Sequence, residues 1–134
     1  MTQAQSYAET YAAAKADPDG WWLEQARAID WQTAPETGYD ADTNTWFADG
    51  IANTCYNCVD RHVEAGRGEQ AAIIHDSPVT GVVEHISYAQ LQDRVARLAG
   101  VLHKRGVLKG DRVVIYMPMV PDALVAMLAC TRIG

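Results

Sequence analysis

The residues best suited to carry chemistry are two cysteines and a histidine that lie close together. Cys55, Cys58 and His62 stand in the segment NTCYNCVDRH, residues 53–62. A C-x-x-C pair with a nearby histidine can bind zinc, and a C-x-x-C pair alone can cycle between dithiol and disulfide. Three interpretations therefore fit this spacing: a metal site, a redox-active pair, or a helix in which the cysteine side chains serve only as packing groups.

These three interpretations differ in what else they require. A structural zinc site usually needs a second ligand pair, and the sequence has no second C-x-x-C and no H-x-x-x-H. A thioredoxin-like redox pair follows a buried strand, whereas loop-like residues precede Cys55. Metal and redox chemistry stay open, but we favour packing, with both cysteines buried on one helix face and metal-free. The residues at helical spacing on that face are Cys55, Cys58, Val59, His62 and Val63.

Two helices and a loop are expected in residues 1–52. The first 16 residues have a helical period, and Asp17-Pro18 offers an N-cap and a first-turn proline for a second helix. Residues 33–52 have no period and many turn formers, so we expect an ordered loop pinned by Trp46 and Phe47. The apolar faces would be Tyr7, Tyr11 and Ala14 on the first helix, and Trp22, Ala26 and Ile29 on the second.

An α/β arrangement is expected in residues 53–134. Two apolar runs, 71–75 and 82–86, are separated by turn formers and indicate a hairpin. A helix over 88–105 should follow, because Ser87-Tyr88-Ala89-Gln90 is a capping box. The run RVVIYM at 112–117 has the continuous apolar character of a strand buried in a parallel sheet. We therefore predict that the helix packs on a small sheet made of all three strands.

The last expected helix, residues 121–133, is apolar nearly all round. Such a helix should be covered on every side, so we expect the isolated chain to self-associate through it. A strand and helix of this kind should be followed by a parallel strand, and none follows Gly134. We thus expect part of a larger α/β protein: N-terminal helices in 1–52, then an incomplete α/β unit in 53–134.

Charge is unevenly distributed over the 134 residues, whose net charge is −6. Residues 1–50 hold two basic and nine acidic residues, whereas residues 51–134 hold nine basic and eight acidic ones. This balance argues against a nucleic-acid groove, and the acidic half is either a docking surface for a basic partner or simply a solvated surface. Neither a signal peptide nor a membrane span is recognisable, so free thiols in the cytoplasm are expected for the three cysteines.

Three stretches resemble a known family over essentially the whole sequence. They are YAETYAAAKADPDGWW, NTCYNCVDRHVEAGRGEQAAII, and ISYAQLQDRVARLAGVLHKRGVLKGDRVVIYMPMVPDALVAMLACTRIG. Together they are similar to the N-terminal region of AMP-forming short-chain acyl-CoA synthetases, the acetyl-CoA and propionyl-CoA synthetases of the adenylate-forming superfamily. The leading Tyr-Ala-Glu segment and AIDW at 28–31 look more like the propionyl branch.

The resemblance implies that the intact enzyme uses ATP, Mg²⁺ and CoA. A small carboxylate, acetate or propionate, would form an acyl-adenylate with release of pyrophosphate, and the CoA thiol would then displace AMP. The family's phosphate loop, acidic site residues and catalytic lysine would lie beyond Gly134, and no P-loop or G-x-G-x-x-G motif is present. We assign no catalytic, cofactor-binding or metal-binding residue here and expect the chain alone to be inactive. The alternative is a stand-alone protein-interaction or scaffold module.

Three polar or loop features remain as candidates. Asp60-Arg61 beside His62 suggests either an acid–base group or, as we favour, a structural ion pair. Residues 116–119, Tyr-Met-Pro-Met, follow the expected strand at its carboxyl end, where α/β folds bind ligands, so this loop would either border the active site or be a structural turn. Four bases could attract the phosphates of CoA, although a helix end explains two of them. They are Lys104, Arg105, Lys109 and Arg112.

Overall fold

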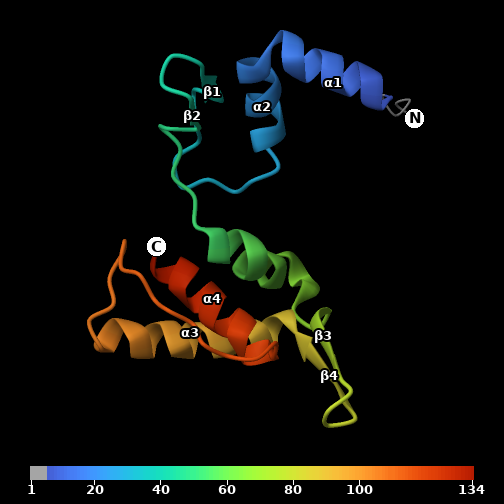
Figure 1. The fold of residues 1–134 in the computed structure, drawn as a ribbon, viewed down its shortest axis with the longest axis vertical. Coiled ribbons are helices and arrows are strands. Elements are labelled where there is room, and N and C mark those ends of the chain that lie inside the picture. The colour runs from blue at the N-terminus through green and yellow to red at the C-terminus, as the bar shows by residue number, and fades with distance from the viewer. Residues whose placement is uncertain (1–5) are drawn as a thin grey trace. The chain divides into compact units, whose positions relative to one another are not determined.

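The computed structural model describes residues 6–134, which form two compact units on either side of the Ala52–Asn53 bond. Figure 1 shows the elements of each unit: two helices and a small ladder before this boundary, and a helical segment (green), a hairpin and two long helices after it. No helix among the described residues is long and apolar enough to cross a membrane.

The two helices of the first unit begin where their capping residues predict. Helix α1 (Tyr7–Ala16) starts with a capping box in which the Ser6 side chain accepts from the Glu9 amide and Glu9 accepts from the Ser6 amide. Helix α2 (Pro18–Ala26) is capped by Asp17, whose Oδ1 accepts from the Gly20 amide at 3.0 Å. Both predicted helices are confirmed over the described residues, because short side-chain-to-backbone bonds satisfy the first amides of each.

The predicted apolar faces of these helices are mostly uncovered. No residue of α1 is buried, and Tyr7 and Tyr11 are 84% and 57% exposed while their rings stack on each other. On α2 only Ala26 is buried, and Ile29 lies beyond the helix end and is exposed. Among the residues described, the predicted apolar faces of this unit are therefore largely exposed to solvent.

The loop over residues 33–52 is ordered by a short ladder and by aromatic contacts. Strands β1 (Tyr39–Asp40) and β2 (Thr45–Trp46) pair antiparallel, and Thr33 bridges Ile51. The Trp46 ring lies 4.4 Å from that of Tyr39, and the Phe47 ring lies 5.6 Å from that of Trp31. The expected pinning by Trp46 and Phe47 is confirmed, although Trp46 keeps 48% of its surface exposed.

The second unit is built on a hairpin and a helix that the sequence predicts. Strands β3 (Ala71–Ser77) and β4 (Val82–Ser87) pair antiparallel, and helix α3 (Tyr88–Lys104) follows directly. The Ser87–Gln90 capping box is present as expected. Helix α4 (Pro121–Ile133) lies beside α3 (Figure 1). The buried core is shared by residues 55–59, β4, α3 and α4 and comprises Cys55, Val59, Ile86, Leu91, Val95, Ala99, Val125, Leu128 and Ala129.

The predicted strand at 112–117 is absent from the sheet, so the prediction of a three-stranded sheet is wrong. The hairpin sheet has two strands, and no backbone hydrogen bond is formed by residues 112–117 within the described chain. Val114 is 91% exposed and Tyr116 fully exposed. An apolar run becomes a strand only when a neighbouring strand supplies donors and acceptors, and no described residue does so here. The unit still combines helices with small strands, in agreement with the predicted α/β fold class.

Candidate functional site

Residues 54–67, which hold the cysteines and His62, form a helix with two π-helical turns. These are η1 (Tyr56–Asp60) and η2 (Val63–Arg67), and Gly66 has a φ of 78°, the left-handed conformation expected where a helix is broken. Asn53 caps the start as predicted, since its Oδ1 accepts from the Tyr56 amide at 3.0 Å. A π-helical turn bonds residue i to i+5, so it is wider than an α-helical turn.

The wider turn explains why the prediction for Cys58 is wrong. Cys55 and Val59 are fully buried, and Asp60 is 6% exposed, whereas Cys58 is exposed. An α-helix would place i+3 on the buried face with i. In the π-helical turn the residues at i+4 and i+5 take that face instead, so Asp60 enters the core and Cys58 leaves it. Cys55 and Val59 pack as expected, and Cys58 does not.

The sulfur and imidazole groups of this helix do not converge. All three cysteines are free thiols, and burial raises the pKa of the Cys55 thiol, which therefore stays protonated at neutral pH. The His62 ring lies 4.8 Å from that of Tyr88 and also contacts the Arg67 guanidinium. In the part of the chain that the structure describes, no three His, Cys, Asp or Glu side chains are placed to hold a metal ion, so we assign no Mg²⁺ ligand here.

The most organised polar group in the unit is an ion pair between helix 54–67 and α4. Asp60 receives two hydrogen bonds from Arg132, from Nη1 to Oδ2 at 3.0 Å and from Nη2 to Oδ1 at 2.9 Å. We call this pair the Asp60–Arg132 clamp. Asp60 thus forms a structural ion pair, but with Arg132, which the prediction for Asp60-Arg61 did not include.

Neighbouring polar groups complete the clamp. Gln92 of α3 donates from Nε2 to Asp60 Oδ1 at 2.7 Å, and Asn53 donates from Nδ2 to the Arg132 carbonyl at 3.1 Å. Arg132 Nη1 also lies 3.5 Å from the Cys55 sulfur. Burial disfavours the Arg132 cation, but the hydrogen bond and charge of Asp60 outweigh it and raise the pKa of Arg132. Both members of the clamp are therefore matched in charge and hydrogen bonding.

Sequence reasoning missed Arg132, although one signal was available. Arg132 follows Val125, Leu128 and Ala129 at spacings of 7, 4 and 3 residues, so it lies on the buried side of α4. A cation on an apolar stripe requires a buried anion. The anion could not be chosen from the sequence, because Asp60 lies 72 residues away.

A cavity of about 370 Å³ lies between α3, α4 and residues 113–117. Its walls are mainly apolar, and Asp122 is its one charged lining residue. Tyr116 and Met117, from the loop expected to border a ligand site, line the cavity, whereas Met119 does not and is 90% exposed. Residues from three segments thus meet around one apolar cavity. The remaining lining residues are Leu98, Leu102, Val113, Val114, Ile115, Val125, Ala126 and Cys130.

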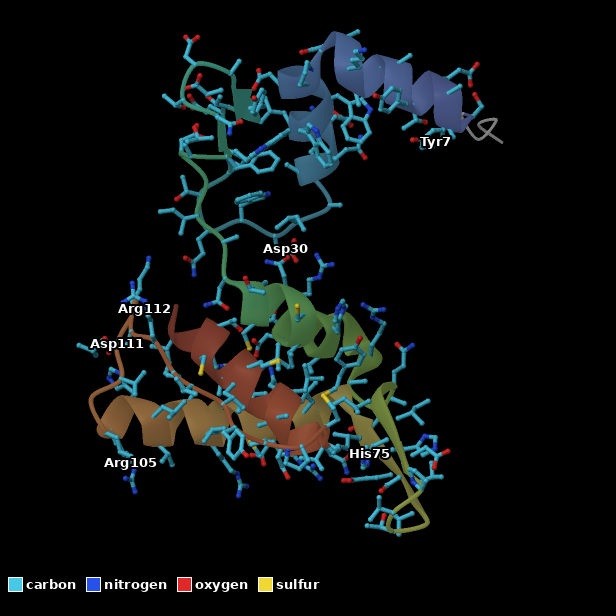
Figure 2. All side chains as sticks on the ribbon, in the orientation of Figure 1. Tyr7, Asp30, His75, Arg105, Asp111 and Arg112 are labelled. Atoms are coloured by element: carbon cyan, nitrogen blue, oxygen red, sulfur yellow. The ribbon has the colours of Figure 1, made fainter. Side chains whose placement is uncertain are left out.

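The four bases proposed to attract phosphates lie at different places: two at the end of α3, and Lys109 beside Gly134 at the end of α4. Lys104 lies in the last turn of α3 and Arg105 caps it, where cations oppose the helix dipole. Figure 2 shows Arg105 and Arg112 pointing away from each other, with Asp111 next to Arg112 in sequence. This arrangement favours the helix-end explanation over an anion site.

Comparison with known proteins identifies the family. A family model described as AMP-binding enzyme matches residues 59–134, more than half of the chain, and one described as Acetyl-coenzyme A synthetase N-terminus matches residues 7–58. The chain belongs to the AMP-binding enzyme family. The junction between the two matched regions falls inside the π-helical turn η1, six residues after the boundary between the compact units.

Curated relatives agree with this assignment, and a solved structure shares the fold. The chain is 50% identical over 132 residues to the mitochondrial acyl-CoA synthetase short-chain family member 3 of Rattus norvegicus, covering 96% of the chain and 19% of the relative. It is 52% identical over 130 residues to the acetyl-coenzyme A synthetase of Streptomyces avermitilis, covering 95% and 20%. It therefore spans about a fifth of their length. The fold matches an acetoacetyl-CoA synthetase from Streptomyces lividans with a TM-score of 0.85 at 24% identity, covering 98% of the chain and 21% of that structure.

Proposed function

We propose that the chain forms the N-terminal part of an ATP-dependent short-chain acyl-CoA ligase. In this reaction a carboxylate oxygen attacks the α-phosphate of ATP, forming an acyl-adenylate and releasing pyrophosphate. The thiol of CoA then attacks the acyl carbon, so that the thioester forms and AMP leaves. The observation that carries the proposal is the match of both family models, which together cover residues 7–134.

Within such an enzyme the described residues would act as a scaffold. The core between α3, α4 and residues 55–59 is tightly buried, whereas the polar clamp is committed to internal bonds. The cavity beside residues 113–117 offers only Asp122 as a charged group. Catalysis of adenylation needs several positioned groups around the developing charge, so we propose that the chain alone neither consumes ATP nor forms an acyl-CoA.

The substrate is proposed to be acetate or propionate. The names of the rat and Streptomyces avermitilis relatives, a short-chain acyl-CoA synthetase and an acetyl-coenzyme A synthetase, support a small carboxylate. A cytoplasmic setting is part of the same proposal, because three free thiols suit a reducing compartment.

We also propose that the isolated chain self-associates through α4, where Leu124 and Met127 are 41% and 50% exposed.

A chimera tests the ligase proposal. The chain would replace the matching region of the Streptomyces avermitilis relative, and pyrophosphate release would be measured with acetate and with propionate as substrates. We expect carboxylate-dependent release from the chimera and none from the chain alone. A folded chimera without activity, beside an active parent, would contradict the proposal, as would release by the isolated chain.

Light scattering of the isolated chain, with Leu124→Ser as the matched variant, tests association through α4.

A further inference from the structure

Helix α4 presents apolar side chains on both its buried and its exposed side. Val125 and Ala129 are 4% and 0% exposed, whereas Leu124 and Met127 are 41% and 50% exposed. The hydrophobic effect is non-directional and depends on the apolar area removed from water. A rotation of α4 about its axis would exchange Met127 for Ala129 in the core and still bury apolar surface. Apolar packing alone therefore does not specify which side of α4 faces α3.

The Asp60–Arg132 clamp is directional where the apolar contacts are not. The planar guanidinium makes two bonds of 2.9 and 3.0 Å to one carboxylate, a geometry that fixes the orientation of both groups. Asn53 binds the Arg132 carbonyl as well, so the backbone at the end of α4 is held together with the side chain. These bonds can all form in only one rotational setting of the helix.

The clamp is also costly to bury, which is a reason to look for a role other than net stability. Asp60 is 6% exposed and sits beside the buried Cys55 and Val59. The Arg132 side chain keeps 31% of its surface exposed, so the pair is largely but not wholly removed from water. Removal from water cancels much of the attraction, and buried ion pairs often contribute little net stability compared with apolar residues of similar size. Their best-supported use is to favour one packing arrangement over alternatives.

We propose that the Asp60–Arg132 clamp selects the rotational setting of α4. It thereby decides which α4 side chains line the cavity beside residues 113–117. In the structure these are Asp122, Val125, Ala126 and Cys130. The clamp acts as a positioning pair for this wall. The inference concerns the packing of the chain itself and is independent of the proposed ligase activity.

Thiol labelling at two α4 positions tests the proposal. Met127→Cys and Ala129→Cys are introduced separately into the full chain, at a concentration where light scattering shows a monomer, so that self-association does not cover position 127. Labelling of each position by N-ethylmaleimide is followed by peptide mass spectrometry. With the clamp intact, the thiol at position 127 should react much faster than the one at position 129, because Met127 is 50% exposed and Ala129 is fully buried. In the double variant Asp60→Leu with Arg132→Met, this ratio of rates should fall by about tenfold or more while denaturant unfolding stays cooperative. A cooperatively folded double variant with an unchanged ratio would overturn the proposal.

Two further variants make the test specific. Arg97→Met breaks an exposed pair on α3, where Arg97 lies 2.9 Å from Asp93, and should leave the ratio unchanged. A fall as large as that of the double variant would overturn the proposal. Arg132→Lys keeps the charge but loses the two-pronged geometry, so the ratio should fall in this variant also. This variant decides the question if the double variant does not fold, and an unchanged ratio in it would overturn the directional role of the clamp.

Discussion

The two units of this chain are stabilised in different ways. The second unit has a shared apolar core that includes Val59, Ile86 and Val95, all fully buried. In the described part of the first unit, the only buried apolar side chain is Ala26. The first unit is ordered instead by helix caps, a two-residue ladder and contacts between aromatic rings. The comparison shows that well-formed local structure does not require a core, although stability does.

The difference also separates two kinds of polar interaction. In the first unit, Asp17, Asp19 and Asp40 accept hydrogen bonds from backbone amides close to solvent. In the second unit, Asp60 is itself buried and accepts its bonds from the partly buried side chains of Gln92 and Arg132. Losing an exposed cap costs one modest bond, whereas breaking a buried pair leaves a charge without water. The following tests rank these effects.

The largest effect is expected from truncating the core of the second unit. Ile86→Ala removes a fully buried side chain and should lower the free energy of unfolding by about 3 to 4 kcal/mol through lost burial and a residual cavity. Ile74→Ala in the same hairpin is the matched control, because Ile74 is 65% exposed and should cost about 0.5 kcal/mol or less. Denaturant unfolding followed by hydrogen exchange in α3 measures both. Equal costs would mean that the hairpin does not belong to the core.

Breaking the clamp on one side should have a slightly smaller effect. Arg132→Met leaves the Asp60 carboxylate buried without its cation and should cost about 3 kcal/mol. Arg97→Met removes an exposed pair at similar distance and should cost about 0 to 0.5 kcal/mol. Chemical denaturation of the two variants gives the comparison directly. A cost for Arg132→Met no larger than that for Arg97→Met would show that Asp60 is well solvated.

Removing a cap should affect only the first unit. Asp17→Ala deletes the acceptor for the Gly20 amide and should destabilise α2 by about 1 kcal/mol. All four tryptophans lie in residues 21–46, so tryptophan fluorescence reports on this unit alone. Hydrogen exchange in α3 should stay as in the parent chain. A matching loss of protection in α3 would indicate that the two units unfold together.

The smallest effects are expected from pH, with opposite signs in the two units. Hydrogen bonding from Ser6 lowers the pKa of Glu9 and that from Thr43 lowers the pKa of Asp40, so their stabilisation is present above the ordinary values of 4.5 and 3.8 and is lost as pH falls below them. Burial raises the pKa of the Cys55 thiol above its ordinary value of 9.0. The contribution of the protonated thiol to stability is therefore complete below pH 9.0 and is lost as the pH rises above that value.

Tryptophan fluorescence should therefore record a loss of stability in the first unit on acidification, and hydrogen exchange in α3 a loss in the second unit under alkaline conditions. Glu9→Gln and Cys55→Ala are the matched variants, and each should flatten one arm of its profile. An alkaline arm that persists in Cys55→Ala would assign that effect to another group.

Local signals in the sequence determined much of the secondary structure. The Ser87–Gln90 capping box and the period of Leu91, Val95 and Leu98 predicted α3, and turn formers between apolar runs predicted the hairpin of β3 and β4. Asp17-Pro18 likewise predicted the start of α2. These signals act within a few residues, so they hold whatever the rest of the chain does. The family resemblance was also visible in three stretches of the sequence.

Tertiary structure alone decided which residues entered the core and which found partners. The π-helical turn turned Cys58 outward and Asp60 inward, and the partner of Asp60 lies 72 residues away in α4. The run at 112–117 has strand-like residues, but no described strand pairs with it. The physical reason is the same in each case: burial and pairing are properties of two surfaces that meet, and a single stretch of sequence specifies only one of them.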